Sequence, residues 1–249
     1  MYKEHEAFEK PDDENVRIWR YTDLARFFLM LEKSALFFVR ADKLEDRFEG
    51  SYSKINVELR KISDMPESAL RQLPEIHEKF RHFTLINCWS INEYESDALW
   101  KAFSKSDEGI AIQSTFRRLA TSFDGSPEDV FIGKVRYVDY STDWIPESNL
   151  FYPFLHKRKS FAHENELRAI IQQVPTRQGS NGKSLEVDPE KEICDIGIYI
   201  HVDLNILIES IFLSPKAQAH FGDAVKAILI KYGLDKKVSL SSLVQNPVY

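Results

Sequence analysis

The stretch 83-FTLINCW-89 is a continuous apolar run of strand length and indicates a strand buried inside a sheet. Further strand candidates lie on both sides of it, at 16–21, 35–39, 109–113, 131–140, 167–171, 197–202, 210–213 and 238–240. Helical stripes are spaced unevenly among them, at 24–31, 54–82, 96–103, 116–123 and 215–232. Because strict strand–helix alternation is missing, the sequence predicts an α+β fold: a single domain with a mixed, mostly antiparallel sheet flanked by helices.

Composition and charge are those of an ordinary globular protein. Of the 249 residues, 43% are hydrophobic and 29% are charged, and a chain of this length can bury a full core without metals or disulfides. The net charge of -6 does not support nucleic-acid binding through a broad basic surface, although a local basic patch stays open. We expect a flexible arm at 1–15, a single domain at 16–249, and a surface loop in the Gly- and Ser-rich stretch 175–192.

The positions of the cysteines and the hydropathy of the sequence bear on metal binding and on cellular location. Cys88 and Cys194 lie in apolar runs and are expected to be small buried hydrophobes, and no Cys/His cluster has zinc spacing. We therefore predict no metal site. The N-terminus lacks an apolar signal segment, and no apolar stretch approaches the length of a membrane span. A cytoplasmic protein without a membrane partner is expected, and its oligomeric state stays open.

Prolines predict several helix boundaries. Pro66 and Pro74 each suit the first turn of a helix, so two helix starts are expected there. Ser214 followed by Pro215 predicts the start of the last long helix. Residues 146–160 are expected to be helical in their second half.

Four short polar blocks stand between the apolar elements. They are Trp19-Arg20-Tyr21, the turn 42-DKLEDRFEG-50, Trp89-Ser90 with Asp97-Ala98-Leu99-Trp100, and 157-KRKSFAHENELR-168. In the last block, a strand period of two places Glu164, Glu166 and Arg168 on one face. Two carboxylates and a guanidinium on one face need mutual pairing or water. A buried network of this kind marks either a functional site or a structural ion-pair cluster.

Structural roles compete with functional ones at the same residues. Arg20 could pair with Asp46 or Glu49 and thereby hold two turns together. Tryptophans such as Trp89 and Trp100 more often belong to a core than to a ligand-stacking surface. A lone histidine in a polar block, here His163, is more often a hydrogen-bonded structural residue than a base.

The order of these blocks resembles the bacterial family catalogued as domain of unknown function 2971. The resemblance covers about residues 19–242 and rests on motifs that are short individually but specific in their order. The motifs are 19-WRY-21, 46-DRFEG-50, 88-CWS-90, 99-LW-100, 108-EGIAI-112, 159-KSFAHENELR-168, 211-IFLSP-215 and 238-VSLS-241. The family commonly has an Asn-Asp-Pro-Phe turn, where this chain has 45-EDRF-48. The resemblance implies no settled activity.

A first function class is an NAD-dependent enzyme of the ADP-ribosyltransferase type. Such enzymes carry an Arg or His on the first strand, an aromatic or Ser on the second, and a Glu on a late strand. Arg20, residues 38–42 and Glu166 fill these places in order, with Glu164 beside Glu166. A carboxylate there would orient a ribose hydroxyl and stabilise an oxocarbenium-like charge. We predict Glu166, Glu164 and Arg20 as catalytic residues and NAD as the candidate cofactor.

A small-molecule or nucleotide ligand is expected as the partner, and two further function classes compete with the first. The ligand-binding candidates are Tyr21, Asp46, Glu49, Trp100, Lys159, His163 and Arg168. The second class is a non-enzymatic ligand-binding or effector module in stress or phage defence. The third is a metal-dependent nuclease that uses Asp46, Glu49, Glu166 and Lys159. The acidic isoelectric point and the lack of an Asp…Glu-x-Lys strand argue against the third class.

Overall fold

A ten-stranded mixed sheet forms the centre of the protein. The computed structural model describes residues 1–103, 107–178, 185–188, 190–245 and 247. The sheet strands are β1 (Tyr2–Lys3), β2 (Arg17–Asp23), β3 (Ala35–Arg40), β4 (Thr84–Ile91), β5 (Gly109–Thr115), β6 (Val130–Lys134), β9 (Glu166–Gln172), β12 (Gly197–His201), β13 (Ser210–Leu213) and β14 (Lys237–Leu240). The pairings in this sheet are antiparallel except β1–β6 and β13–β14. The predicted fold class is confirmed.

Helices and two small strand pairs complete the fold. The helices are α1 (Leu24–Lys33), α2 (Lys54–Lys61), α3 (Glu67–Phe83), α4 (Asp97–Phe103), α5 (Phe116–Ser122), α6 (Leu204–Leu207) and α7 (Ala219–Lys231). The short 3-10 turns are η1 (Ala41–Lys43), η2 (Tyr152–Phe154), η3 (Lys159–Glu164) and η4 (Ser242–Val244). Outside the main sheet, β7 (Arg136–Val138) pairs with β8 (His156–Arg158), and β10 (Thr176–Gln178) pairs with β11 (Leu185–Val187). None of the described helices combines the length and apolar character needed to cross a membrane.

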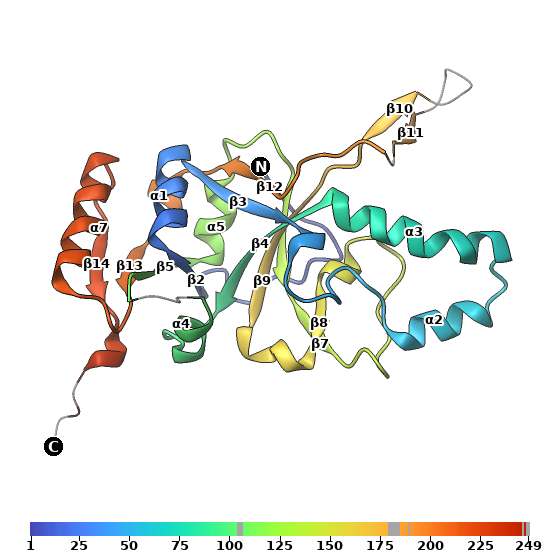
Figure 1. The fold of residues 1–249 in the computed structure, drawn as a ribbon, viewed down its shortest axis with the longest axis horizontal. Coiled ribbons are helices and arrows are strands. Elements are labelled where there is room, and N and C mark those ends of the chain that lie inside the picture. The colour runs from blue at the N-terminus through green and yellow to red at the C-terminus, as the bar shows by residue number, and fades with distance from the viewer. Residues whose placement is uncertain (104–106, 179–184, 189, 246, 248–249) are drawn as a thin grey trace.

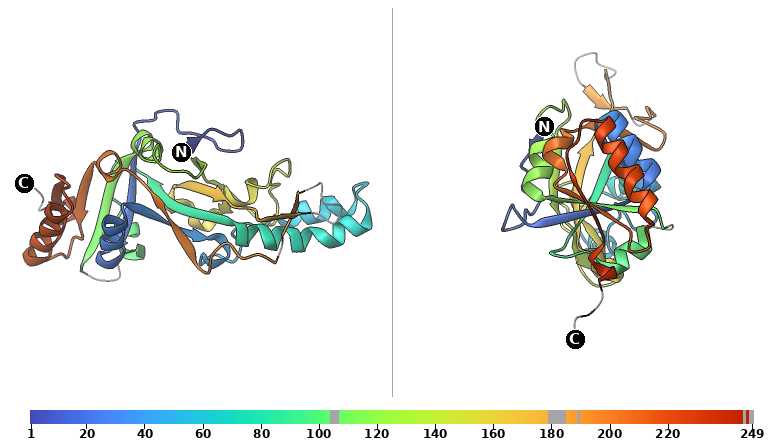
Figure 2. Two further views of the ribbon diagram at one scale, coloured as in Figure 1. Left: turned by 90° about the horizontal axis from the view of Figure 1, so that it is seen from above. Right: turned by 90° about the vertical axis from the view of Figure 1, so that its left-hand side faces the viewer.

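The molecule is elongated along the sheet. Figure 1 shows α2 and α3 extending at one end, while α7 and β14 lie at the other. Seen from above in Figure 2, the strands twist progressively between these two ends. The elements that carry the four polar blocks therefore lie in the middle of the molecule.

Strand β4 lies at the centre of the sheet and pairs with three other strands. Its residues 84–90 pair with β9 along one edge. On the other edge β3 pairs with Leu85 and Ile86, while β2 pairs with Ser90 and Ile91. The sheet therefore forks along this edge. The prediction of a buried strand at 83–89 is confirmed, because β4 is covered on both edges.

The two faces of β4 differ in chemistry. Leu85 and Trp89 point into the main apolar core, which α1 and α5 complete with side chains such as Phe27 and Leu119. On the opposite face, strand alternation places Cys88 and Ser90 beside polar partners. The polar face is the one that carries the candidate site.

Several predicted boundaries are corrected by the structure. Pro74 lies inside α3 and does not start a new helix; this part of α3 faces solvent, where water can replace the missing amide. Ser214 does not begin α7, which starts at Ala219, because Ser214 closes a separate turn by accepting a bond from the Ala217 amide. The second half of 146–160 forms η2 and β8 instead of an α-helix.

The stretch expected to be an arm and the stretch expected to be a surface loop form different structures. The N-terminal arm lies against the sheet, because β1 pairs with β6 and Phe8 is 6% exposed. A Cβ at Gly133 would come within 2.9 Å of the Phe8 backbone, so this close approach depends on glycine. The described part of 175–192 contains the β10–β11 hairpin, and residues 179–184 and 189 lie outside the described residues.

Candidate functional site

A buried ionic cluster lies on the polar face of β4 and β9. We call it the ionic cluster; it consists of Glu49, Lys157, Glu164, Glu166 and Arg168. Arg168 is 0% exposed and donates to both Glu49 oxygens at 2.7 Å. It also donates to Glu166 at 2.9 and 3.0 Å and to the Phe154 carbonyl at 2.6 Å. All five N–H groups of this guanidinium are therefore satisfied.

Local backbone geometry brings the carboxylates to one side. Asn165 has a φ of 42°, a left-handed conformation that asparagine tolerates, and it separates η3 from β9. Glu166 and Arg168 then lie on the same strand face, as predicted from period two. Glu164 belongs to η3 and not to the strand. It still joins the cluster, because the Ser90 hydroxyl holds its carbonyl at 2.6 Å.

Lys157 links the three carboxylates. Its ammonium donates to Glu164 at 2.6 Å and to Glu166 at 3.1 Å, and it lies 3.7 Å from Glu49. With every group ionised, two cations face three carboxylates, which leaves one negative charge in excess. The cluster can therefore stabilise a positive charge that develops next to it.

Burial and charge act on the two glutamates in opposite ways. Burial raises the pKa of Glu164, and its contact with Lys157 only partly offsets this. At Glu166 burial also opposes ionisation, but the charges of Arg168 and Lys157 lower its pKa to about 2. Two carboxylates with diverging pKa values suit different tasks, because one can exchange a proton while the other stays charged.

A surface layer covers the ionic cluster toward solvent. Arg158 follows Lys157 on β8 and donates to both oxygens of Asp46, at 2.6 and 3.2 Å. Its guanidinium lies 4.6 Å from the ring centre of Phe48 and 5.3 Å from that of Phe161. Phe48 is 40% exposed, and the Glu164 side chain keeps 16% of its surface in solvent. We call Arg158, Phe48 and Phe161 the surface layer, and Glu164 is the member of the ionic cluster that reaches solvent beside it.

The first and third polar blocks meet the fourth across β4. Strand register puts Trp19 beside Ser90, and Ser90 beside Glu166, in one row on the polar face. Next to this row, Tyr21 and Trp100 pack edge to face with ring centres 5.0 Å apart. Both rings are buried, so they belong to a small core beneath α4. Trp89 packs on the opposite face, in the main core.

Arg20 occupies the fork of the sheet. Its Nη1 donates to the Cys88 carbonyl at 2.6 Å, between the short ladders that β2 and β3 form with β4. The predicted pairing of Arg20 with Asp46 or Glu49 is wrong, because these carboxylates bind Arg158 and Arg168 instead. Burial lowers the pKa of the Arg20 guanidinium. Arg20 therefore supports the β4 main chain and makes no ion pair with the cluster.

Two predicted ligand residues are exposed to solvent and are not members of the ionic cluster. Lys159 is exposed and donates to Asp143 at 3.0 Å, and His163 is exposed on η3. The lysine that binds the carboxylates is Lys157, which the sequence analysis did not single out. Its signal was its position beside Arg158 in the fourth block. The three-residue strand that holds it is too short to be told from a helix by periodicity.

The acidic side chains suggested for a metal site already have cationic partners. Asp46 binds Arg158, and Glu49 and Glu166 both bind Arg168. Among the residues that the structure describes, no group of three His, Cys, Asp or Glu side chains is arranged to hold a metal ion. Cys88 is half-buried beside Glu166, and burial raises the pKa of its thiol well above the usual value.

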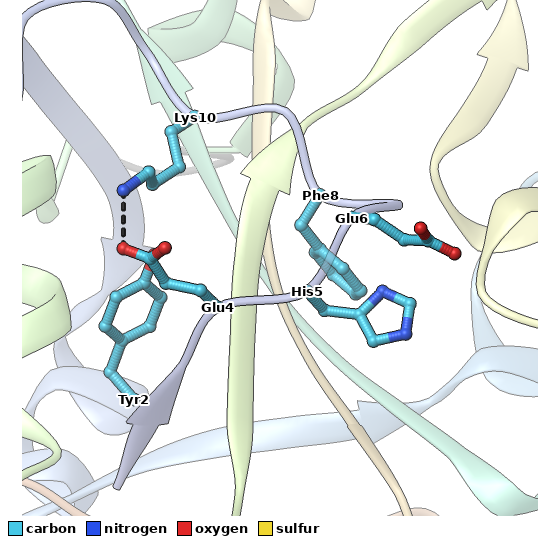
Figure 3. A pocket seen from close by; sticks show the side chains of 6 residues that line it. All are labelled: Tyr2, Glu4, His5, Glu6, Phe8 and Lys10. Atoms are coloured by element: carbon cyan, nitrogen blue, oxygen red, sulfur yellow. Dashed lines mark hydrogen bonds and ion pairs between the residues drawn. The ribbon is translucent and has the colours of Figure 1, made fainter.

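One hollow lies away from the cluster and is lined by residues of the N-terminal arm. Figure 3 shows its lining, with His5 and Phe8 on one side and the ion pair of Lys10 with Glu4 on the other. Its volume is about 270 Å³. Residues of the four polar blocks do not line it, so it is separate from the candidate site.

Comparison with known proteins finds no matching family model and no matching curated protein. Among solved structures, the chain is similar to Thermus sp. 2.9 DarT in complex with NAD+, with a TM-score of 0.39 and 11% identity over 94% of this chain and 99% of that chain. It is also similar to the same DarT in complex with ADP-ribosylated ssDNA, with a TM-score of 0.39 and 13% identity over 96% and 100% of the two chains. Likeness at this level carries no argument about function.

Proposed function

We propose that this chain is an NAD-dependent ADP-ribosyltransferase-like enzyme of the domain of unknown function 2971 type, with its reaction centre at Glu164 and Glu166. The observation that supports the proposal is the arrangement of this carboxylate pair at the start of β9. β9 borders β4, and β4 in turn borders β2 and β3. The three strands that the hypothesis requires therefore meet around one central strand.

The surface layer and Glu164 offer the groups that a dinucleotide needs. A pyrophosphate requires N–H donors on a cation, and Arg158 at the edge of the cluster has donors beyond those that bind Asp46. The nicotinamide ring requires an aromatic face, and Phe48 and Phe161 flank the Arg158 guanidinium. The ribose hydroxyls require a carboxylate acceptor, and Glu164 is the cluster carboxylate that reaches solvent.

The chemistry follows from the charges of the ionic cluster. In the proposed reaction, the bond between ribose C1′ and the nicotinamide nitrogen breaks, and its electron pair leaves with nicotinamide. The excess negative charge of the cluster stabilises the positive charge at C1′. A nucleophile of the acceptor then bonds to C1′ and gives its proton to Glu164, whose raised pKa suits a general base. Glu166 stays ionised between Arg168 and Lys157 and positions the lysine.

Nicotinamide release from NAD tests the proposal. We expect NAD to raise the Tm of the protein, and Glu164→Gln to reduce nicotinamide release about 10²–10³-fold, the usual loss for one electrostatic group at a reaction centre. The exposed Glu67, which pairs with Arg71 on α3, gives the matched control Glu67→Gln with unchanged release. Absence of both a Tm shift and nicotinamide release would refute the proposal.

A second candidate function rests on the completeness of the buried pairing. Because every N–H of Arg168 is used inside the protein, the cluster also suits a rigid non-enzymatic ligand-binding module. A Tm shift with NAD but no nicotinamide release, in the presence of any acceptor tested, favours that module.

A further inference from the structure

A second groove with basic walls lies at the end of β2 and β5. Its volume is about 710 Å³. Three arginines line it, Arg17 from β2 and Arg117 and Arg118 from α5. Asn205 of α6 and Thr121 add polar groups to the lining. The groove concentrates positive charge on a protein whose net charge is -6, and it is the local basic patch that composition alone left open.

Arg118 is held in place by the protein itself. Its Nη1 donates to the Ile206 carbonyl at 2.6 Å, and its amide is capped by the Thr115 hydroxyl at 3.2 Å. Within the described part of the chain, no carboxylate lies in ion-pair contact with Arg118. A guanidinium that is anchored at one nitrogen and has no acidic partner is preorganised for an external anion.

The positive field extends behind the α6 wall of the groove. Lys236 donates to the Asn205 carbonyl at 2.8 Å. Burial lowers the pKa of Lys236 and the charge of Arg118 lowers it further, while the charges of Asp203 and Asp235 partly offset both effects. The two cations therefore lie close enough to act on each other.

The acidic residues near the groove do not neutralise it firmly. Arg17 pairs with Glu93 at 2.5 Å, and the two side chains are 44% and 61% exposed. Arg117 pairs with Glu14 at 3.3 Å, and this pair is also exposed. Such solvent-exposed pairs contribute little free energy, so an incoming phosphate can displace them. Glu209 lines the groove as well and is outnumbered by the three arginines.

We propose that this groove binds the phosphate groups of a phosphate-ester ligand. Planar guanidinium groups on two walls match the bidentate geometry of phosphate oxygens. The site is separate from the ionic cluster, since none of its lining residues contributes to that cluster, and it does not depend on the proposed enzymatic function. A free nucleotide and a single-stranded nucleic acid present the same phosphate chemistry.

Binding of two probes tests the proposal with the full chain. Calorimetry with inorganic pyrophosphate and fluorescence anisotropy with a labelled single-stranded oligonucleotide report the two sources. We expect Arg118→Gln and Arg117→Gln each to weaken binding about tenfold. The matched control is Arg71→Gln, an exposed arginine that pairs with Glu67 on α3, far from the groove. The Arg117 side chain is exposed and its ion pair with Glu14 is exposed as well, so its variant tests the site even if Arg118→Gln folds poorly.

The two probes separate the sources of phosphate. Binding of pyrophosphate and the oligonucleotide with similar affinity, lost in both variants, indicates a nucleotide-sized ligand. Much tighter binding of the oligonucleotide, with a salt slope that falls by about 0.7 per arginine removed, indicates a nucleic-acid strand. The proposal is overturned if neither probe binds or if Arg117→Gln and Arg118→Gln bind as well as Arg71→Gln.

Discussion

Removing one carboxylate from the ionic cluster should destabilise the whole domain. Glu49 is 2% exposed and accepts two hydrogen bonds from Arg168, which is fully buried. In Glu49→Gln, an NH₂ group replaces one of the two accepting oxygens and faces an N–H donor of Arg168. Arg168 then keeps only Glu166 as a charged partner. Breaking a buried pair from one side costs about 3–5 kcal/mol. Because Glu166 remains, we expect a loss near the lower end, about 3 kcal/mol.

Urea unfolding followed by circular dichroism measures this loss. For a domain of this size, the expected change corresponds to a Tm lower by about 6–12 °C. Glu67→Gln removes a carboxylate from the exposed pair with Arg71 and should change the free energy of unfolding by less than about 0.5 kcal/mol. If Glu49→Gln cost less than about 1 kcal/mol, the pair would not be the desolvated, fully bonded contact described above.

Two further predictions concern Glu166 of the ionic cluster and the two glycines that have positive φ. Arg168 and Lys157 lower the pKa of Glu166 to about 2 against the opposing effect of burial. The contribution of Glu166 to stability is therefore present above a pH of about 4.5 and is lost as the pH falls toward about 2. Acid unfolding of Glu166→Gln should accordingly start from a lower stability and depend less on pH in that window, and an unchanged pH dependence contradicts the assignment. Gly50 and Gly233 both have positive φ, but only at Gly50 would a Cβ meet a ring, at 2.4 Å from Phe154. Thermal unfolding should show Gly50→Ala to be the more destabilising of the two by at least about 1 kcal/mol, and equal losses would contradict the clash.

Most strands of the main sheet were predictable from the sequence, but their partners were not. The predicted single strand at 131–140 divides into β6 and β7, which belong to separate sheets. The largely apolar run at 83–89 and the strand-like stretch at 167–171 identify β4 and β9. Pairing across the sheet depends on contacts between residues far apart in the chain, as between β2 and β5. No local pattern encodes such a register. Proline marked one helix start correctly, because Pro66 caps α3, and failed at Pro74, which is tolerated inside solvent-facing α3.

The acidic residues of the candidate site were predictable from the sequence, and its basic residues were less so. Glu166 and Arg168 share a face because strand alternation is local, and Glu49 was chosen for its place in a polar turn. Lys157 was missed because adjacent basic residues look equivalent in sequence, and only the three-residue strand β8 turns Lys157 inward and leaves Lys159 in solvent. Neighbouring lysines can be told apart only when the backbone direction is known.

The central position of β4 has a consequence for synthesis on the ribosome. β4 leaves the exit tunnel long before β9, the strand that covers its full second edge. At a synthesis rate of about 5–20 residues per second, the apolar β4 edge waits on the order of ten seconds for its partner. During that time an unpaired hydrophobic strand is open to pairing with other nascent chains. Expression yield should therefore depend on chaperones that hold this intermediate until Arg168 emerges.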